Sequence, residues 1–515
     1  MRLTIGILGY EAGWEILSRQ IGVNWKLLST SDELSCETFS TIVVNTPPTS
    51  LQEKLLEQYL VEGGAILALG SCAQRLVTSK LKRKYFSSLP PSLFGSFAQP
   101  TMMDIYSSGV LDATSFSENH QLPSIHKVGK GIFAAIPFNI NALVLDTRSK
   151  RKNFYFDKDR LPNETVATVS KGNLRRFITE MLQFLHHERK IPFIHKWYFP
   201  ENRETIFTFR VDSDQGSLTE VNDLHELCKN HSIRTMWFID TKSHERWLAR
   251  FKDFGQQDVG VHCYEHMTFP AEEKNLHNIL KALSLLNAQG VHPKGAAAPY
   301  GTWNASIASV FEQIGTGFSS EFGLDYDDLP FFPFVDNKFS PVMQLPIHPI
   351  CVGSMRRAGY SVEEMGRYFR QLVDIKIQQR EPLCLYHHPT HHHLDLFADI
   401  FDYVRSKRVD NYSYPEYASW WRTRDETVWT HHFDRERNEL TAHSTDPNAG
   451  VHWRIVFPNG EESIVNSEGT ISLQSLPLSH PQHKPLPPAD IARSRRYDFR
   501  HVILNVLDAW YKRTQ

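Results

Sequence analysis

Apolar runs alternate with helical periodicity along most of this chain, and that alternation restricts it to an α/β fold. Between about residues 203 and 425, short apolar runs such as TIFTFRV (205–211) precede stretches whose apolar residues recur every three or four positions. Parallel strands joined by helices require this order. About six or seven such units favour a barrel-like closed sheet over a small sandwich, and in a βα barrel the chemistry lies at the C-terminal ends of the strands. The predicted strands are 205–211, 233–239, 258–262, 294–300, 342–347 and 382–388.

The first part of the chain, residues 1–192, shows the same alternation on a shorter scale. It is predicted to form a parallel sheet with surrounding helices, one of which starts where Ser50 and Glu53 have capping-box spacing. This part resembles a flavodoxin-like or glutamine-amidotransferase-like domain. Cys72 follows an apolar run, at the place of a nucleophile elbow, but Gln74 breaks the G-x-C-x-G pattern. We therefore expect Cys72 to be an ordinary buried or half-buried thiol.

After about residue 428 the periodicity changes from helical to alternating. In VHWRIVF (451–457) every second residue is apolar, and Pro458-Asn459-Gly460 supplies a hairpin turn. These features predict a small antiparallel β module, followed by a linker and an amphipathic C-terminal helix. The chain is thus expected to divide into an α/β domain, a barrel, a β module and a terminal segment, at 1–192, 203–425, 428–480 and 481–515.

Charge and cysteine usage exclude several classes of protein. The chain has 56 Lys and Arg against 58 Asp and Glu, a formal net charge of −2, whereas a nucleic-acid binder needs a basic surplus. No run approaches the length of about 18 apolar residues that spans a membrane. The start of the chain lacks the pattern of a signal peptide, and the six cysteines form no C-x-x-C pair. We expect a cytoplasmic protein with no nucleic-acid partner and no integral membrane segment.

The first polar cluster lies at the end of the run 205–211, in FTFRVDSDQG. Arg210, Asp212 and Asp214 alternate along the chain, so on a strand their side chains would project to the same face. Two carboxylates beside an apolar strand cost free energy unless a cation joins them. The alternative is that one of the two aspartates only caps the following turn.

The second polar cluster follows the run 258–262. His262 and His266 are four residues apart, so one helical turn would bring both imidazoles to one side. This spacing is typical of metal ligands, although histidine pairs at this spacing also occur by chance. One aspartate and two histidines would leave open coordination positions, as in catalytic rather than structural metal sites, and the second aspartate would be free to act as a base.

The third polar cluster ends the run 382–388. His387 and His388 would lie at the same end of the barrel as the other two clusters, and an unperturbed histidine titrates near neutral pH, as a general acid or base requires. The histidines at 391–393 are expected to form a solvated loop rim. Adventitious binding of a second cation at this rim is the alternative.

Four segments, FTFRVDSDQG, HCYEH, AAAPYGTWN and CLYHHP, occur in this order with helices predicted between them. Together they resemble the motifs of the polysaccharide deacetylase family, the NodB-type carbohydrate esterase family four. The spacing R-V-D-x-D is most similar to that of the branch containing the formamido-arabinose lipid deformylases. The resemblance covers roughly residues 203–410 and implies a distorted (β/α) barrel of NodB type.

The resemblance implies a metal-dependent reaction. A divalent metal, commonly zinc, would be held by Asp214, His262 and His266. Asp212 matches the general base that deprotonates the attacking water. The metal of such an enzyme acts both as a Lewis acid on the amide carbonyl and as the source of the nucleophile.

The resemblance also implies roles in the later steps. Tyr300, in the A-P-Y-G stretch, matches the residue whose backbone N–H helps to stabilise the oxyanion. His388 matches the histidine that protonates the departing amine. His387 is the alternative for that role, because a shift of one residue in strand register exchanges the two.

The chain departs from the family pattern at its third motif. Ala297 occupies the position where the family usually has an arginine that tethers the catalytic aspartate. Arg210 could supply the missing positive charge from the same strand face as Asp212 and keep that carboxylate ionised. This pairing is a prediction for the structure.

The family's fourth motif, an aspartate with a tryptophan, has no clear counterpart. The nearest candidate is EFGLDYDDLPFFP, in which Asp325, Asp327 or Asp328 could line the mouth of the site; a turn rich in aspartate and proline is the alternative. Aromatic residues in the same stretch could form a stacking wall for a substrate or belong to the core. They are Tyr326, Phe331, Phe332 and Phe334.

These observations predict a metal-dependent amide hydrolase that removes an acetyl or formyl group from an N-acyl sugar or a related small-molecule or glycan substrate. Because the expected arginine and tryptophan are missing, the alternative is a catalytically silent barrel that acts as a carbohydrate-binding or scaffold protein. A third interpretation makes the N-terminal domain the active part, as an amidotransferase-like enzyme. The sequence leaves the identity of the metal, the acyl group and homo-oligomerisation open.

Overall fold

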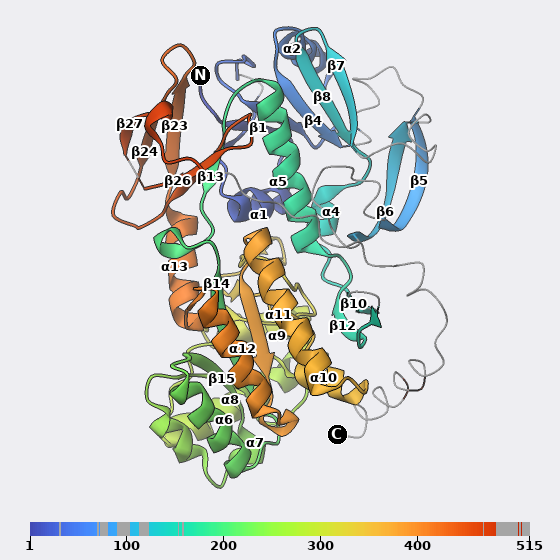
Figure 1. Cartoon of the computed structure of the whole chain (residues 1–515). Coiled ribbons are helices and arrows are strands. Elements are labelled where there is room, and N and C mark those ends of the chain that lie inside the picture. Colours follow the sequence, from blue (N-terminus) through green and yellow to red (C-terminus); the bar gives the residue numbers. More distant parts are fainter. Residues whose placement is uncertain are drawn as a thin grey trace. The chain divides into compact units, whose positions relative to one another are not determined.

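The computed structural model describes residues 1–29, 32–69, 72, 81–89, 103–112, 123–152, 154–156, 159–466, 468–479, 503 and 506. The chain forms two compact units, each a mixed α/β structure with parallel strands (Figure 1). Apart from 503 and 506, the linker and helix predicted for 481–515 lie outside the described residues. Unit 1 comprises Met1–Asp146, Val169–Asn202 and Trp420–Pro485, and unit 2 comprises Thr147–Thr168, Arg203–Ser419 and Leu486–Gln515.

A six-stranded sheet occupies the N-terminal part of unit 1, in the order β2-β1-β3-β4-β8-β7. All neighbours are parallel except β7, which pairs with β8 in the antiparallel direction at the edge. Strands β1, β3 and β4 are buried at every residue, as expected of parallel strands covered on both faces. The strands are β1 (Ile5–Leu8), β2 (Trp25–Leu27), β3 (Thr41–Val44), β4 (Ala65–Leu69), β7 (Ser124–Val128) and β8 (Gly131–Ile136).

The predicted helix of unit 1 begins within one residue of its predicted position. The capping box expected at Ser50 and Glu53 is displaced by one residue, because Thr49 is the last residue with extended backbone. The Thr49 hydroxyl accepts from the Gln52 backbone N–H, and the Gln52 side chain accepts from the Thr49 backbone N–H. The helices are α1 (Ala12–Ile21), α2 (Ser50–Val61), α4 (Ile140–Val144) and α5 (Lys171–Glu188).

Two small antiparallel sheets and a hairpin also belong to unit 1. The sheets, in the orders β13-β25-β26 and β23-β24-β27, share one apolar core that includes Met1 and Ile194. The strands that follow residue 428 therefore pack against segments from the N-terminal half of the chain. The strands are β5 (Leu81–Leu89), β6 (Met103–Asp112), β13 (Phe193–Lys196), β23 (Trp429–Asp434), β24 (Glu439–Ser444), β25 (Trp453–Val456), β26 (Glu462–Val465) and β27 (Gly469–Ser472).

Parallel strands form the centre of unit 2. Strands β14 (Ile206–Asp212), β15 (Thr235–Asp240), β16 (Asp258–Cys263) and β21 (Leu383–His387) lie in the order β16-β15-β14-β21, and β22 (Asp410–Asn411) also pairs with β14. All four long strands are buried throughout. Their common direction brings the C-terminal ends of β14, β16 and β21 to one edge.

Shorter elements extend this arrangement. β17 (Phe318–Ser319) pairs with β20 (Met343–Gln344) in parallel, and Ala296 forms bridges to both β16 and β17. The backbone N–H of His348 donates to the carbonyl of Cys384 on β21. The remaining strands form antiparallel pairs: β9 (Ser149–Lys152) with β12 (Glu164–Ala167), β10 (Tyr155–Phe156) with β11 (Asp159–Arg160), and β18 (Phe334–Val335) with β19 (Lys338–Phe339).

Helices follow the strands of unit 2, and α11 and α12 lie side by side (Figure 1). Their buried residues share a core with β14, β15 and β21. The helices are α6 (Leu218–Asn230), α7 (Thr241–His244), α8 (Glu272–Ala288), α9 (Ala305–Gln313), α10 (Val352–Arg357), α11 (Val362–Gln379), α12 (Leu394–Ser406) and α13 (Tyr414–Glu426), which contains the boundary between the units. Within the described ranges, no helix is both long and apolar enough to cross a membrane.

Two predicted strands of unit 2 are much shorter than expected. In 294–300 only Ala296 forms bridges, because the turn Pro299–Gly301 begins three residues later and proline has no N–H to donate. In 342–347 only Met343–Gln344 is a strand, and prolines lie close on both sides. Both runs are buried connections rather than regular strands.

Arg424, near the end of α13, joins several backbone segments of unit 1. It is fully buried, and its guanidinium donates to the carbonyls of Trp197 (2.7 Å), Gln20 (3.0 Å) and Lys196 (3.0 Å). Gly22 ends α1 in the left-handed region at φ 85°, and a Cβ there would lie 2.5 Å from Nη2 of Arg424. The close approach of the guanidinium thus depends on glycine at this position.

We expect Arg424→Met to lower the free energy of unfolding by at least about 3 kcal/mol, because several buried carbonyls lose a charged donor at once. Urea denaturation followed by circular dichroism measures the change. Arg437→Met is the matched control: the Arg437 side chain is 75% exposed, and its replacement should change stability by less than about 0.5 kcal/mol. Equal effects of the two substitutions would contradict the role of Arg424.

Candidate metal centre

Three residues from two segments of unit 2 bring ligand atoms to one point. Asp214, His262 and His266, here called the metal triad, each offer an atom within 4.8 Å of the other two. Oδ2 of Asp214 is 3.0 Å from Nε2 of His266, and Oδ1 is 3.2 Å from Nε2 of His262. The two Nε2 atoms are 3.2 Å apart. The structure therefore brings together the three residues for which the sequence predicted a shared cation.

Asp214 lies in the turn directly after β14 rather than on the strand. The turn is held by the neighbouring Ser213, whose N–H donates to the Phe238 carbonyl on β15 and whose hydroxyl lies 2.9 Å from Nε2 of His244. The N–H of Gly216 closes the turn by donating to the Ser213 carbonyl. These contacts place the carboxylate at the C-terminal end of the sheet.

His262 lies within β16 and is oriented by a backbone carbonyl. Its Nδ1 is 2.6 Å from the carbonyl oxygen of Ala297, which fixes the proton on Nδ1 and leaves the Nε2 lone pair facing Asp214. The ring is 1% exposed. Ala297 thus contributes its carbonyl group to the centre.

His266 lies in the loop after β16, which is not the helical turn that the sequence predicted. Asn278 of α8 holds this loop: its Oδ1 accepts from the N–H groups of Tyr264 and Glu265, and its Nδ2 donates to the carbonyls of Glu265 and Met267. A buried amide thus replaces the helical hydrogen bonds that would otherwise fix the spacing of the two imidazoles.

The metal triad has the properties of a cation site. Burial alone would raise the pKa of the Asp214 carboxyl, but His266 and His262 outweigh it and hold that pKa well below its usual range. Oδ1 of Asp214 is buried and has no hydrogen-bond partner in the described part of the chain. One carboxylate and two imidazoles are ligands that zinc accepts, and Asp214 and His266 are 20% and 12% exposed, which leaves the centre accessible.

Arg210 and Asp212 form a buried ion pair next to the metal triad. Nε of Arg210 is 2.5 Å from Oδ1 of Asp212, and Nη2 is 2.8 Å from Oδ2. Nη1 donates to the carbonyl of Ser320. Burial alone would lower the pKa of Arg210, but the charge and hydrogen bonds of Asp212 raise it above its usual value. The expected contact between the two residues is confirmed, and its bidentate form is the strongest that arginine makes with a carboxylate.

His388 lies beside both carboxylates, and His387 does not. Nε2 of His388 is 3.4 Å from Oδ2 of Asp214 and 4.0 Å from Oδ2 of Asp212. Burial disfavours the protonated ring, but contacts with Asp214 and Cys351 raise the pKa of His388 to about 10. The His387 ring is buried against the Phe397 ring at 4.3 Å between centroids. Burial and nearby imidazoles lower the pKa of His387 well below its usual value.

Tyr300 borders the centre from the turn Pro299–Gly301. Its backbone lies in the left-handed region, with φ 58°, which is uncommon for a residue with a side chain and is found where a site imposes it. Its ring meets the His266 ring edge-on at 4.7 Å between centroids. Glu321 anchors the preceding residues by accepting from the N–H of Ala298 at 3.0 Å. Burial raises the pKa of Glu321 to about 7.

The aspartates of EFGLDYDDLPFFP make contacts that fit the turn interpretation. Asp325 and Asp328 each accept a hydrogen bond from the backbone N–H of the next residue. Asp327 binds His348 Nδ1 and Lys376 Nζ, both at 2.9 Å. Tyr326 is 9% exposed and packs edge-on against Phe154, as the core interpretation of the aromatic residues predicts.

Three residues around the centre were not predicted from the sequence: Asn278, Glu321 and Cys351. The first two are polar residues that are at most 5% exposed. Asn278 stands in the apolar stripe of α8, which is the only sequence signal that could have marked it. Nothing in the local pattern marks Glu321 or Cys351, because their partners come from distant segments.

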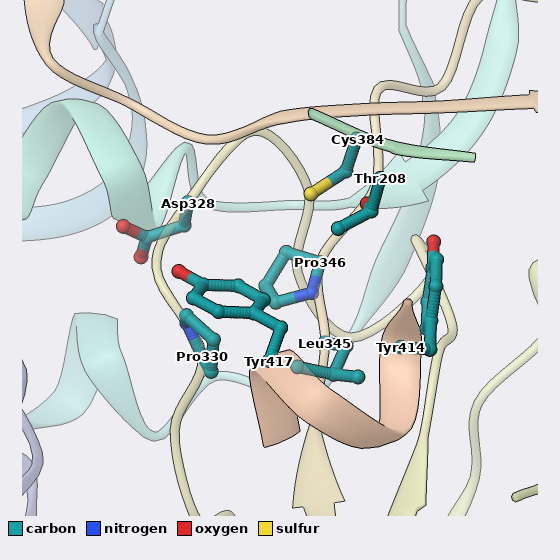
Figure 2. Close-up of a pocket in the computed structure, with 8 residues that line it drawn as sticks. All are labelled: Thr208, Asp328, Pro330, Leu345, Pro346, Cys384, Tyr414 and Tyr417. Atoms are coloured by element: carbon teal, nitrogen blue, oxygen red, sulfur yellow. The ribbon is translucent and has the colours of Figure 1, made fainter. Parts of the chain in front are cut away.

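A narrow cavity elsewhere in unit 2 is too tight for a water molecule. Thr208 and Cys384 in its wall lie four residues before Asp212 and His388 on their strands, which is roughly 13 Å along each strand. Figure 2 shows Tyr414 and Tyr417 entering it from one turn of α13. The cavity is a packing gap in the N-terminal half of the sheet and not part of the centre. It is lined by Thr208, Asp328, Pro330, Leu345, Pro346, Cys384, Tyr414 and Tyr417.

No protein-family model matches the chain, and no curated protein sequence matches it. Solved structures with some similarity include a protein from Mycobacterium smegmatis assigned as a polysaccharide deacetylase. It is 14% identical, and the match covers 44% of this chain and 92% of that chain with a TM-score of 0.37. Puue allantoinase is 14% identical; the match covers 44% of this chain and 92% of that chain, with a TM-score of 0.38. A family 4 carbohydrate esterase from Streptomyces lividans in complex with acetate is 14% identical; the match covers 40% of this chain and 91% of that chain, with a TM-score of 0.29. Likenesses of this size carry no argument about activity.

We expect the purified chain to retain one tightly bound divalent cation, and Asp214→Ala to weaken zinc binding at this centre by at least about 100-fold, because a charged ligand is lost. Isothermal titration of the metal-free protein with zinc, together with elemental analysis, measures both. Asp395→Ala, at an exposed carboxylate in the same unit, is the control and should bind like the wild type. A wild-type chain that binds no divalent cation at micromolar concentrations would contradict the assignment.

Proposed function

We propose that this chain is a metal-dependent hydrolase of a non-peptide carbon–nitrogen amide bond, which deacetylates or deformylates an N-acyl sugar or a related substrate. One observation carries the proposal: the metal triad, the pair of Asp212 with Arg210, and His388 converge at the C-terminal edge of the sheet in unit 2. A cation site flanked by a carboxylate and an imidazole is the set of groups that amide hydrolysis requires.

Asp212 is the proposed general base. A bound divalent cation would supply a Lewis acid for the amide carbonyl and would make a nearby water molecule more acidic. Asp212 accepts the proton of the attacking water, and its bidentate contact with Arg210 holds both carboxylate oxygens in place. Arg210 is itself fixed by the Ser320 carbonyl, so the carboxylate is held in one orientation.

His388 is the proposed general acid. Amide cleavage requires a proton on the departing nitrogen, because an unprotonated amine is a poor leaving group. Nε2 of His388 lies near both carboxylates, which favour its protonated form. His387 is less suited to the role because its Nε2 lies 3.0 Å from the His392 carbonyl and its ring is buried in the core.

Tyr300 is the proposed oxyanion-stabilising residue, through its backbone N–H. The left-handed backbone at Tyr300 and Gly301 turns this segment sharply beside His266. The hydrogen bond from Ala298 to Glu321 keeps the turn in place. A rigid backbone donor of this kind stabilises charge that develops on a carbonyl oxygen without reorganisation.

Two finer features of the fold belong to the same proposal. The order β2-β1-β3-β4-β8 has the pattern 2-1-3-4-5 of flavodoxin-like sheets, which supports that arrangement for the N-terminal part. The hydrogen bond from His348 to Cys384 links the segment after β20 to β21, which supports a distorted barrel in unit 2.

The spacing of Arg210, Asp212 and Asp214 supports the deformylase branch and hence an N-formyl substrate.

The activity test is a panel of N-acetyl and N-formyl amino sugars offered to the zinc-loaded chain, with released amine as the readout. We expect turnover on at least one member, and Asp212→Asn to lower it by about 10²- to 10⁴-fold because the base is removed. Asp395→Asn is the isosteric control and should retain activity. Sugar binding without turnover would favour the carbohydrate-binding alternative instead.

Arg210 provides a further prediction. In Arg210→Met the Asp212 carboxylate loses both of the hydrogen bonds that orient it, so turnover should fall by about 10- to 100-fold. Arg210→Lys keeps the positive charge but not the bidentate geometry, so its turnover should lie between those of Arg210→Met and the wild type. Turnover is measured on protein shown to be folded by its unfolding transition. Unchanged turnover in Arg210→Met would contradict the assigned role.

A further inference from the structure

A second set of metal-ligating side chains lies next to the metal triad. Cys351, His388 and His391 each offer a ligand atom within 4.8 Å of the other two. Sγ of Cys351 is 4.0 Å from Nδ1 of His391, and the rings of His388 and His391 are 4.3 Å apart between centroids. His391, expected on a solvated rim, is instead half-buried, whereas the side chain of His392 is 59% exposed.

The backbone holds these three residues in place. Cys351 immediately precedes α10, where its N–H donates to the Ser354 hydroxyl at 3.3 Å. A short turn, Pro389–His391, folds His391 back over His388, since the His391 N–H donates to the His388 carbonyl at 3.0 Å. The arrangement does not rest on a flexible loop.

Gly353 leaves the space that the His391 ring occupies. A Cβ at residue 353 would lie 2.2 Å from that ring, a distance at which the ring would have to move. Only glycine at position 353, the second residue of α10, thus leaves room for the cluster. Close packing of an imidazole on a helix of this kind fixes the ring's position, as a ligand requires.

The two ring nitrogens of His388 have different surroundings. Its Nε2 lies 3.4 Å from Oδ2 of Asp214 in the metal triad. Its other nitrogen, Nδ1, is buried and has no hydrogen-bond partner among the residues that the structure describes. A buried nitrogen without a partner costs free energy that a bound cation would recover.

We propose that Cys351, His388 and His391 form a second cation site, which takes a borderline or soft divalent ion such as zinc and is distinct from the metal triad. One thiolate and two imidazoles suit zinc and cobalt, whereas magnesium and calcium require oxygen ligands that this cluster lacks. Three protein ligands leave a fourth position open. On binding, a metal–sulfur bond replaces the S–H bond of Cys351, and a metal–nitrogen bond replaces the N–H bond at the ligating nitrogen of protonated His388; both protons are released to solvent.

Loading of this site has a consequence that rests on the proposed function. An imidazole that binds a cation through one nitrogen would become an imidazolate if it gave up the proton on the other, so a ligated His388 is a much weaker general acid for the departing amine. We therefore expect the second equivalent of zinc to inhibit a reaction that the first equivalent supports. The second site is in this way an inhibitory zinc site built around the catalytic histidine.

Cobalt titration of the metal-free chain tests the site without any activity measurement. Cobalt bound to a thiolate gives a sulfur-to-metal charge-transfer band in the near ultraviolet, which the metal triad cannot give because it contains no sulfur. We expect this band in the wild type and its loss in Cys351→Ser. His391→Asn should weaken cobalt binding at this site by at least about 10-fold.

Cys384→Ser is the matched control, because Cys384 is another buried thiol of unit 2 that lies outside the cluster. It should retain the band. A wild type that shows no thiolate band at millimolar cobalt would overturn the proposal. A band that survives Cys351→Ser and disappears in Cys384→Ser would overturn it as well, since a different thiol would then be the ligand.

Zinc inhibition tests the consequence separately. Activity is measured against added zinc and expressed for each variant relative to its own value at one equivalent. The wild type should lose activity beyond the first equivalent, and Cys351→Ser should not. Inhibition that persists in Cys351→Ser after the cobalt band is lost would overturn the inhibitory role. If no substrate is turned over at all, the proposed function fails, while the cobalt titration still decides whether the site exists.

Discussion

The cost of placing two carboxylates at the buried end of β14 is the constraint on which the centre of unit 2 depends. Asp212 is 5% exposed and Asp214 lies within reach of three imidazoles, so neither charge is stabilised mainly by water. Arg210 compensates the charge of Asp212 through two hydrogen bonds, and the three nearby histidines compensate the charge of Asp214. Buried charges persist only when such partners are held in place, and removal of one partner leaves the other uncompensated. The surrounding hydrogen bonds therefore serve to fix these partners.

Periodicity in the sequence was enough to predict β14, β16 and β21 and hence the shared edge where their polar residues meet, because strands buried on both faces leave a strong apolar signal. The Arg210–Asp212 contact followed from alternation on one strand. The run 294–300 was wrong as a strand for a local reason, since Pro299 begins a turn. Asn278 and Glu321 could not be predicted, because the loops that they hold acquire their partners only from the tertiary structure.

The choice between His387 and His388 also could not be made from the sequence, because it depends on the tertiary structure. Adjacent residues on a strand point to opposite faces, so the sequence defined two alternatives and could not separate them. The structure pairs Val211 with His387 across β14 and β21 and buries His387 against Phe397. His388, one residue beyond the strand, then lies beside the carboxylates. Strand register depends on how segments far apart in the sequence pair with each other. The periodicity of one strand therefore cannot predict it.

His388 couples two donor sets of different chemistry in one ring. The surroundings of the two ring nitrogens differ: carboxylates lie near Nε2, and Nδ1 is buried with no hydrogen-bond partner among the described residues. Metal ligation weakens an imidazole as a proton donor, because the ligating nitrogen must give up its proton and loss of the second proton would leave an imidazolate. In the proposed scheme, the concentration of free zinc determines whether His388 is a metal ligand or a proton donor. Zinc has this effect by binding to the cluster that contains Cys351 and not by binding to the metal triad.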